Sequence, residues 1–142
     1  MSGKVTPDIR RMVVKRAGNC CEYCRLSQDD AFYRFHIEHI IARKHRGTDD
    51  LDNLCLSCQH CNVHMGTDLG GIDNITNTFT FLFHPRRDKW DEHFRLIESF
   101  VEGITATGRV TVFLLNMNSQ QQLSKREALR TLNRYPCAIS PS

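Results

Sequence analysis

Two Cys-x-x-Cys pairs constrain this chain more than any other feature of its sequence. Cys21–Cys24 and Cys58–Cys61 enclose residues 25–57. A two-residue gap lets both thiolates of a pair bind one metal ion, and two pairs complete a tetrahedral site of four cysteines. Such a site has no open coordination position, so the sequence predicts structural Zn²⁺, whose binding free energy is part of the folding free energy. The alternative is that these residues are reduced cysteines of an ordinary core.

The other three cysteines carry less information. Cys20 would replace Cys21 only with a three-residue gap, so Cys21 is the expected ligand. Cys55 lies at an apolar strand position and is expected to be a small buried side chain. Cys137 lies near the end of the sequence and predicts nothing. No apolar signal-peptide segment follows Met1, so we expect a cytoplasmic protein with reduced thiols, and the odd total of seven cysteines also argues against a disulfide framework.

The composition fits one globular domain, or a compact domain with an extension. The chain has 142 residues, of which 40% are hydrophobic and 25% charged, and it has no apolar run of 18 residues that would cross a membrane. The net charge of +3 falls to about +1 if four thiolates bind one Zn²⁺, so any attraction to a polyanion must come from local basic clusters. These clusters are Arg10-Arg11 with Lys15-Arg16, Arg43-Lys44-His45-Arg46, and Arg86-Arg87 with Lys89. Each cluster alone also fits a solvated face.

Hydrophobic periodicity and turn residues predict the elements of the first half. They are a helix begun by Thr6 and Pro7 and ended by Gly18, a strand over 32–40, a polar loop over 42–52, a strand over 53–56, and a helix capped by Ser57 and ended by Gly66. The 32–40 segment alternates, so His36 and Glu38 lie on one face of the strand and Ile37 and His39 on the other.

After Gly70-Gly71 the pattern changes to that of a smaller mixed unit. The predicted elements are a strand through Phe79, Phe81 and Phe83, strand signals with a turn over 94–104, a helix that begins near Thr107-Gly108, and a helix over Ser124–Asn133 that ends before Pro136. The predicted fold class is therefore α+β, with residues 1–70 as a core domain and residues 71–142 as an extension packed on it.

The residues between the cysteine pairs carry a more specific pattern. After the first pair come Ile37-Glu38-His39-Ile40-Ile41 and Gly47-Thr48-Asp49-Asp50-Leu51-Asp52-Asn53-Leu54, and Asn62 directly follows the second pair. This combination, over residues 15–70, resembles the HNH endonuclease family. The run 83–94, Phe-His-Pro-Arg-Arg-Asp-Lys-Trp-Asp-Glu-His-Phe, is similar to the extension of small stand-alone bacterial members.

The resemblance implies a ββα-metal core, in which two strands and a helix surround one catalytic cation and structural zinc holds the ends. By position, His39 matches the general base and Asn53 the central asparagine that orients it, while Glu38 and Asn62 match ligands of the cation. Asn62 stands where the family pattern has histidine, and Glu38 where aspartate is more usual. Both offer oxygen ligands, so the predicted cation is Mg²⁺ or Mn²⁺.

The chemistry of these residues supports the same roles. Histidine titrates near neutral pH and is suited to take a proton from water, and one divalent ion stabilises both the transition state and the departing 3′ oxygen. Neighbouring strand residues point to opposite faces, so Glu38 and His39 can serve the ion and the water separately. The alternatives are structural: a strand histidine, an exposed carboxylate, a loop cap at Asn53 and an ordinary helical position at Asn62.

The remaining candidates are contacts with nucleic acid. These are Arg43, Lys44 and Arg46 beside the site, Arg86 and Arg87 in the extension, His36 as a further ligand or phosphate contact, and His60 and His64 on the following helix. The resemblance thus implies a DNA endonuclease that nicks duplex strands to leave 5′-phosphate and 3′-hydroxyl ends. The rival hypotheses are a non-catalytic zinc module that binds nucleic acid, a nuclease for RNA, and a nuclease that acts only within a larger assembly.

Overall fold

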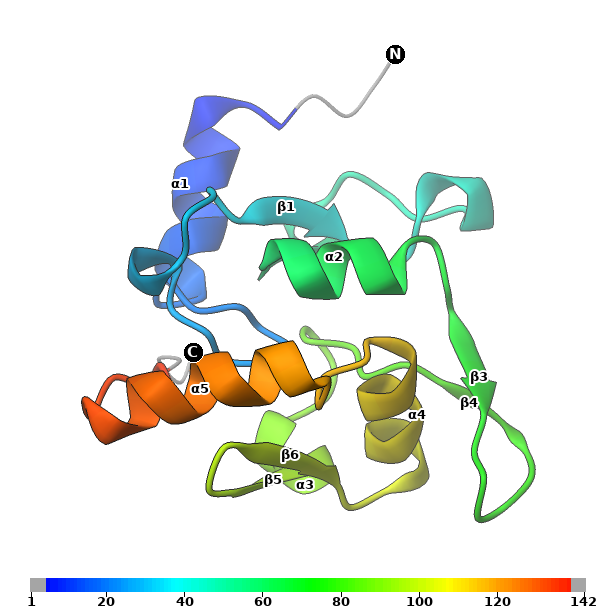
Figure 1. The fold of residues 1–142 in the computed structure, drawn as a ribbon. Coiled ribbons are helices and arrows are strands. Elements are labelled where there is room, and N and C mark those ends of the chain that lie inside the picture. Colours follow the sequence, from blue (N-terminus) through cyan, green and yellow to red (C-terminus); the bar gives the residue numbers. More distant parts are fainter. Residues whose placement is uncertain (1–4, 139–142) are drawn as a thin grey trace.

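The computed structural model describes residues 5–138 as a mixed α+β fold (Figure 1), which confirms the predicted class. Within this range the strands pair as three two-stranded antiparallel sheets: β1 (His36–His39) with β2 (Leu54–Ser57), β3 (Gly70–Ile72) with β4 (Phe79–Phe81), and β5 (Phe94–Ile97) with β6 (Phe100–Gly103). The α-helices are α1 (Pro7–Arg16), α2 (Gln59–Met65), α3 (Trp90–His93), α4 (Ala106–Leu114) and α5 (Gln120–Thr131), and short 3-10 helices lie at Gln28–Asp30, Arg43–His45 and Leu51–Asn53.

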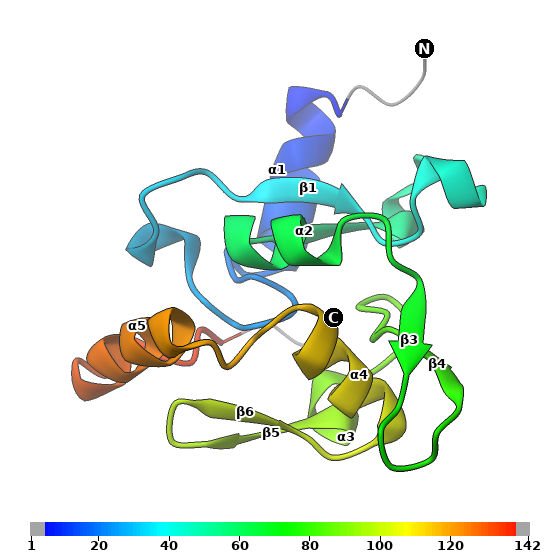
Figure 2. The same ribbon diagram turned by 45° about the vertical axis from the view of Figure 1, so that its right-hand side comes forward.

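The first hairpin and α2 form a ββα unit, and α1 covers its other side. His39 pairs with Leu54 at the end of the hairpin. α2 packs on β1 and α1 on β2, and Figure 2 shows β1 passing between the two helices. Arg16 at the end of α1 donates to the carbonyl oxygens of Leu51 (3.0 Å) and Leu54 (2.6 Å). These bonds attach α1 to β2 and direct this member of the first basic cluster inward.

Side-chain caps begin the helices at or near the predicted positions. Thr6 caps α1 as predicted, because its Oγ1 accepts a hydrogen bond from the Ile9 amide at 3.2 Å. The prediction that Ser57 caps α2 is wrong. Cys58 is the cap, and its Sγ accepts from the Cys61 amide, because the Cys-x-x-Cys turn itself forms the first turn of the helix.

Three segments differ from the expected elements. β1 is shorter than the predicted 32–40 strand, because the backbone of Phe35 binds side chains instead of a partner strand: its amide donates to Gln28 and its carbonyl accepts from Arg10. α5 begins at Gln120 rather than at Ser124, and its cap is Ser119. β3 and α3 were not predicted, since three or four residues carry too little periodicity.

The extension packs through α4, which contacts β3, β4 and β6. Two glycines allow α4 to lie close to β6 and to the end of α3. A Cβ at Gly108 would lie 2.0 Å from the His93 carbonyl oxygen, and one at Gly103 would lie 2.4 Å from the Arg109 amide nitrogen. Arg109 also donates to the buried Asp73 at 2.8 Å. The β3–β4 turn and β6 are therefore both joined to α4.

One hydrophobic core extends from the ββα unit into the extension. The Trp90 indole donates to the Tyr23 carbonyl oxygen at 2.7 Å, and the Tyr135 hydroxyl donates to the Cys24 carbonyl oxygen at 2.6 Å. The predicted boundary at residue 70 coincides with the start of β3. Residues on both sides of it share the core.

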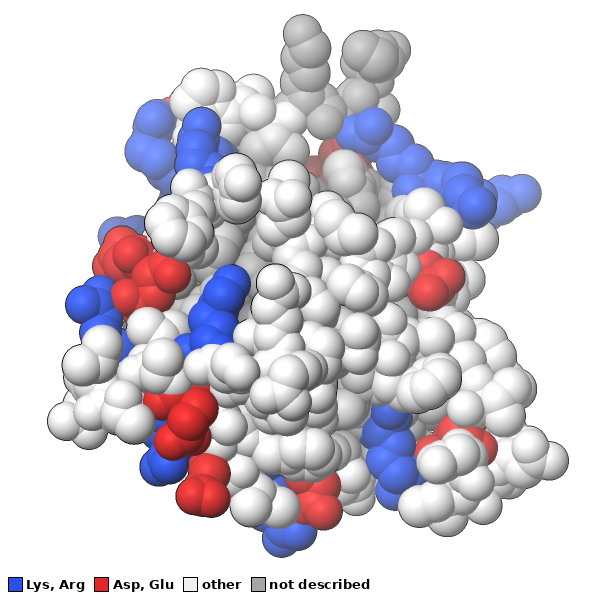
Figure 3. All heavy atoms as spheres, in the orientation of Figure 1, with Lys and Arg blue, Asp and Glu red and all other residues white. Residues whose placement is uncertain are grey.

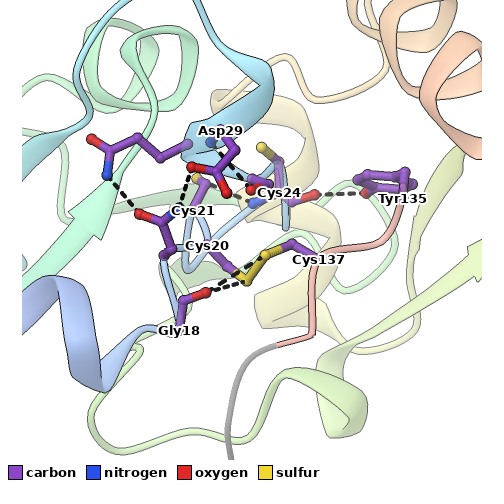
Figure 4. The surroundings of a disulfide bond; sticks show 10 residues. Gly18, Cys20, Cys21, Cys24, Asp29, Tyr135 and Cys137 are labelled. Atoms are coloured by element: carbon purple, nitrogen blue, oxygen red, sulfur yellow. Dashed lines mark hydrogen bonds between the residues drawn. A yellow bond between two sulfur atoms is a disulfide. The ribbon is translucent and has the colours of Figure 1, made fainter. Parts of the chain in front are cut away.

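Cys20 and Cys137 form a disulfide with their Cα atoms 5.7 Å apart, although the two residues are separated by 117 positions. Figure 4 shows this bond beside the Cys21–Cys24 turn, where Tyr135 also binds the backbone of Cys24. The prediction that all cysteines are reduced is therefore wrong. The physical reason is the return of the C-terminal segment to the first cysteine pair, which no local pattern around Cys137 indicates.

Among residues 5–138, no helix combines the length and the apolar character that crossing a membrane requires.

Candidate active site

The two cysteine pairs converge inside the protein. The Sγ atoms of Cys21, Cys24, Cys58 and Cys61 all lie within 4.8 Å of one another, and all four residues are buried. The Sγ atoms of Cys24 and Cys58 are 3.7 Å apart. This distance is close to the edge of about 3.8 Å in a tetrahedron whose metal–sulfur bonds are about 2.3 Å long. The donor set and its spacing fit one tetrahedrally coordinated metal ion.

Each turn of the cluster directs a backbone amide at a sulfur. The Cys24 amide points to Cys21 Sγ and the Cys61 amide to Cys58 Sγ, each at 3.5 Å. Hydrogen bonds with the neighbouring thiols, that of Cys21 first, raise the pKa of Cys61 well above its usual range, and burial adds to the rise. The Cys61 thiol therefore keeps its proton unless a cation replaces it, which couples metal binding to folding.

His39 ends β1, and its ring is held by the loop that follows. Its Nε2 lies 2.7 Å from Asp49 Oδ1, and Arg43 Nε donates to the same carboxylate oxygen at 2.9 Å. In the neutral tautomer that donates from Nε2 to this carboxylate, Nδ1 carries the lone pair. The side chain of His39 is 20% exposed, so a water molecule has access to the ring.

Asn53 fastens the loop that follows His39. Its Oδ1 accepts from the Ile41 amide at 2.9 Å, and its Nδ2 donates to the carbonyl oxygens of Ile41 (3.0 Å) and Thr48 (2.7 Å). Gly47 allows this closure, because a Cβ there would lie 1.6 Å from the Ile41 carbonyl oxygen. The Asn53 side chain therefore fixes the backbone two residues after His39.

Glu38 is the buried acidic residue of β1, and it meets α2. Asn62 Nδ2 donates to Glu38 Oε1 at 3.3 Å. Burial raises the pKa of Glu38 to about 7, and the nearby Ser57 and Asn62 oppose this rise only in part. Its second oxygen, Oε2, is buried without a hydrogen-bond partner among the described residues. A buried carboxylate oxygen without a partner lowers the stability of the folded state unless a cation binds it.

The Glu38–Asn62 pair fits a hard divalent ion. A carboxylate oxygen and an amide oxygen are the ligand types that Mg²⁺ and Mn²⁺ prefer, and turning the Asn62 amide by half a rotation brings its oxygen to the position of Nδ2. Because Glu38 and His39 are adjacent in β1, the carboxylate and the imidazole lie on opposite faces of one strand end.

The other predicted histidines occupy different surfaces. His36 is exposed at the start of β1 and lines a groove between α1 and β1. His64 stacks on His60 with ring centroids 4.1 Å apart, and its Nδ1 lies 2.8 Å from the His60 carbonyl oxygen. His60 Nε2 lies 3.0 Å from the carbonyl oxygen of Asn116. The His60–His64 pair thus connects α2 to the end of α4.

The basic candidates fall into two groups. Arg43, Lys44 and Arg46 are exposed at one end of the ββα unit, where Figure 3 shows positive side chains at the upper right. Arg86 is instead bound to the buried Glu22, and its own side chain is 14% exposed. Arg87 is exposed and lines a hollow with Arg46 and Asn53, and Arg86 lines the same hollow. Of the two arginines, Arg87 is therefore the more accessible to a ligand.

Two acidic residues of this region were not identified from the sequence. Asp49 contacts His39, but in the sequence it is one of several aspartates in a polar loop. Glu22 accepts hydrogen bonds from the Leu56 amide and from Arg86, and so joins the first cysteine pair to β2 and the extension. In the sequence, the position of Glu22 between Cys21 and Cys24 is the feature that indicates its burial.

The comparisons with known proteins agree with this geometry. Residues 21–68 match the family model described as HNH endonuclease, and this segment contains both cysteine pairs, the β1–β2 hairpin and α2. The class of protein that this segment matches is therefore that of the HNH endonucleases, as the resemblance predicted. Among curated proteins, the Septu protein PtuB of Bacillus thuringiensis is 24% identical over 119 residues, which cover 82% of this chain and 44% of that protein. The chain thus spans less than half the length of this relative. No solved structure matches it significantly.

Proposed function

We propose that this protein is a metal-dependent endonuclease that hydrolyses phosphodiester bonds of DNA, with His39 as the general base. The proposal rests on two adjacent residues at the end of β1. Glu38 offers a buried carboxylate oxygen without a hydrogen-bond partner among the described residues, and His39 offers an imidazole oriented by Asp49. A binding module has no need of this combination.

The four-cysteine cluster is proposed to hold structural Zn²⁺. Four thiolates leave no open coordination position, so this ion takes no part in hydrolysis. It joins the first turn, which carries Cys21 and Cys24, to the start of α2, which carries Cys58 and Cys61. The cluster thereby fixes the helix that presents Asn62 to Glu38.

In the proposed reaction, His39 Nδ1 accepts a proton from the attacking water. Asp49 keeps the hydrogen of the ring on Nε2 and stabilises the imidazolium that forms. Asn53 positions His39 indirectly, because it fixes the backbone that follows β1. Removing the proton as the water attacks avoids building positive charge on the nucleophile.

Glu38 and Asn62 would hold the second ion, Mg²⁺ or Mn²⁺, through one oxygen each. When bound, such an ion supplies charge stabilisation at the scissile phosphate and at the departing 3′ oxygen. The expected products are a 5′-phosphate and a 3′-hydroxyl, and a single site of this kind cuts one strand at a time. Arg43, Lys44, Arg46 and Arg87 are proposed as phosphate contacts.

The proposed organisation places this chemistry in residues 1–70 and treats residues 71–142 as an extension that completes the core. Trp90 and Tyr135 support the packing of the extension on the core, since both donate to backbone carbonyls of the first cysteine turn. The extension therefore buttresses the metal cluster.

The test is nicking of supercoiled plasmid by the purified protein with Mg²⁺, with Mn²⁺ and with EDTA. A folded His39→Ala variant serves as the control. Metal-dependent conversion to the open circle, absent in the variant, supports the proposal. A folded, zinc-loaded protein that nicks with neither metal contradicts it. Cleavage rates on DNA and RNA duplexes of the same sequence then test the choice of substrate. Faster cleavage of the RNA would overturn the assignment to DNA.

A further inference from the structure

A groove between α1 and β1 gathers positive charge without an acidic side chain in its wall. The cationic residues that line it are Arg10, Arg11, Lys15 and Arg34, with the exposed His36 beside them. No Asp or Glu belongs to the lining within the described part of the chain. α1 lies outside residues 21–68, so the family match does not account for the α1 wall of this groove.

The four cations have different roles in the groove. Arg10 joins its walls, because it donates to the Phe35 carbonyl oxygen at 2.8 Å. Burial and the nearby Arg34 lower the pKa of Arg10, so two guanidinium groups repel each other at close range. Lys15 and Arg34 are exposed, and no ion pair joins either of them to another residue of the range 5–138. Arg11 has only an exposed pair with Asp8, which a phosphate can replace at little cost.

The spacing of these cations suits a nucleic-acid backbone. Arg11 and Lys15 are four residues apart on α1, which is about 6 Å along the helix axis. Phosphates of one DNA strand follow one another at about 3.4 Å along the duplex axis, so the two side chains match about two steps. Figure 3 shows positive side chains over α1 at the upper left and a mostly uncharged surface over α2.

The groove also leads to the candidate active site. Ile37 lines it and shares a face of β1 with His39, because alternate strand residues point the same way. A backbone that lies along α1 and continues along β1 therefore reaches the imidazole. The walls present cations and the residues that lead into β1, and Phe35 is buried, so the groove is suited to phosphates and not to base stacking.

We propose that the α1–β1 groove binds the DNA phosphate backbone next to the scissile bond, with Lys15 and Arg34 as its main phosphate contacts. This inference rests on the proposed nuclease function and adds a substrate-binding surface to it. The contacts position the duplex and carry no sequence information.

The test measures binding of a short labelled DNA duplex by the His39→Ala protein over a range of salt concentrations. The Lys15→Gln/Arg34→Gln double substitution is compared with Lys125→Gln, which removes an exposed charge on α5. Loss of two phosphate contacts lowers the slope of log K against log salt by about 1.8 in magnitude, and weakens binding at low salt by roughly tenfold or more. Lys125→Gln leaves slope and affinity unchanged.

Cleavage assays on the same changes in the active protein separate the two proposals. With the groove variant we expect a lower kcat/KM and an unchanged kcat at saturating DNA. A folded double variant with the slope and affinity of the parent overturns the groove, even if the parent nicks DNA. A parent that binds through the groove but never nicks overturns the nuclease function and leaves the groove standing. Absence of duplex binding by the His39→Ala protein overturns the groove as well.

Discussion

The imidazole of His39 and the carboxylate of Asp49 form a direct contact, with 2.7 Å between Nε2 and Oδ1. Arg43 binds the same oxygen, so the carboxylate is itself held in place. Nε2 is thereby bound to the carboxylate, and Nδ1 is the ring nitrogen that the proposed reaction uses. The contact joins the end of β1 to a loop ten residues further along the chain.

The first prediction concerns this contact. Asp49→Asn keeps the shape of the side chain but offers Nε2 an amide that can donate as well as accept, so the ring loses its preferred tautomer. We expect a fall in kcat of roughly 10- to 100-fold, and a deeper loss of about 10²- to 10⁴-fold for His39→Ala. Single-turnover nicking with Mg²⁺ measures both. An Asp49→Asn protein as fast as the parent would show that the contact has no part in catalysis.

The second prediction concerns Asn53. Replacing it with Ala removes three hydrogen bonds to the loop and leaves the Ile41 and Thr48 carbonyls to find other partners. We expect a loss of about 1–3 kcal/mol in the free energy of unfolding, faster exchange of the Ile41 amide, and a lower kcat. Denaturant titration and hydrogen exchange measure the first two. Rapid exchange at Ile41 in the parent would contradict the proposed fastening.

The four-cysteine cluster could be predicted from sequence because its information is local. Each Cys-x-x-Cys pair specifies a turn, and the choice of Cys21 over Cys20 followed from spacing alone. The structure agrees, since Cys21 lies in the cluster and Cys20 in the disulfide. The same holds for α1, whose start is specified by Thr6 and Pro7.

Contacts that depend on tertiary closure could not be predicted in this way. Asp49 reaches His39 only because Gly47 and Asn53 close the loop, and nothing in the loop sequence distinguishes it from Asp50. Arg86 is a candidate phosphate contact in a basic run, and its partner Glu22 lies 64 positions earlier. The Arg86–Glu22 pair requires the packed extension to be in place.

The third prediction separates structural zinc from catalysis. Cys58→Ser removes one thiolate from the closed cluster and also replaces the cap of α2, so we expect loss of bound zinc and a protein that is unfolded or strongly destabilised. His39→Ala should keep its zinc and unfold within about 1 kcal/mol of the parent. Metal analysis and thermal denaturation measure the outcome. If Cys58→Ser melts like the parent, the structural-zinc assignment is wrong.

The fourth prediction concerns the Cys20–Cys137 disulfide. The bond closes almost the whole described chain into a loop, and closing long loops restricts the unfolded state most. We expect Cys137→Ser to lower the free energy of unfolding by about 2–4 kcal/mol. A thiol reductant should lower the Tm of the parent to that of the variant and leave the variant unchanged. The reverse result, a parent whose Tm ignores the reductant, would mean that the bond adds no stability.

The fifth prediction follows from the burial of Glu38, whose pKa is about 7 in the folded protein against 4.5 for the ordinary side chain. Between these two values the folded state holds the proton more tightly than the unfolded state. Folding stability from this group is therefore complete below pH 4.5, declines as the pH rises, and is lost above pH 7.

Glu38→Gln has no such ionisation, so in EDTA its stability relative to the parent should increase from about pH 5 to about pH 8 by roughly 2–3 kcal/mol. Denaturant titrations of both proteins at the two pH values give this difference, and the zinc content of each sample is the control. With Mg²⁺ in excess the parent should regain stability at the higher pH and the variant should not, because only the carboxylate binds the ion strongly. A difference that stays constant with pH would show that the Glu38 carboxyl is solvated, which would remove the main structural argument for an ion at this position.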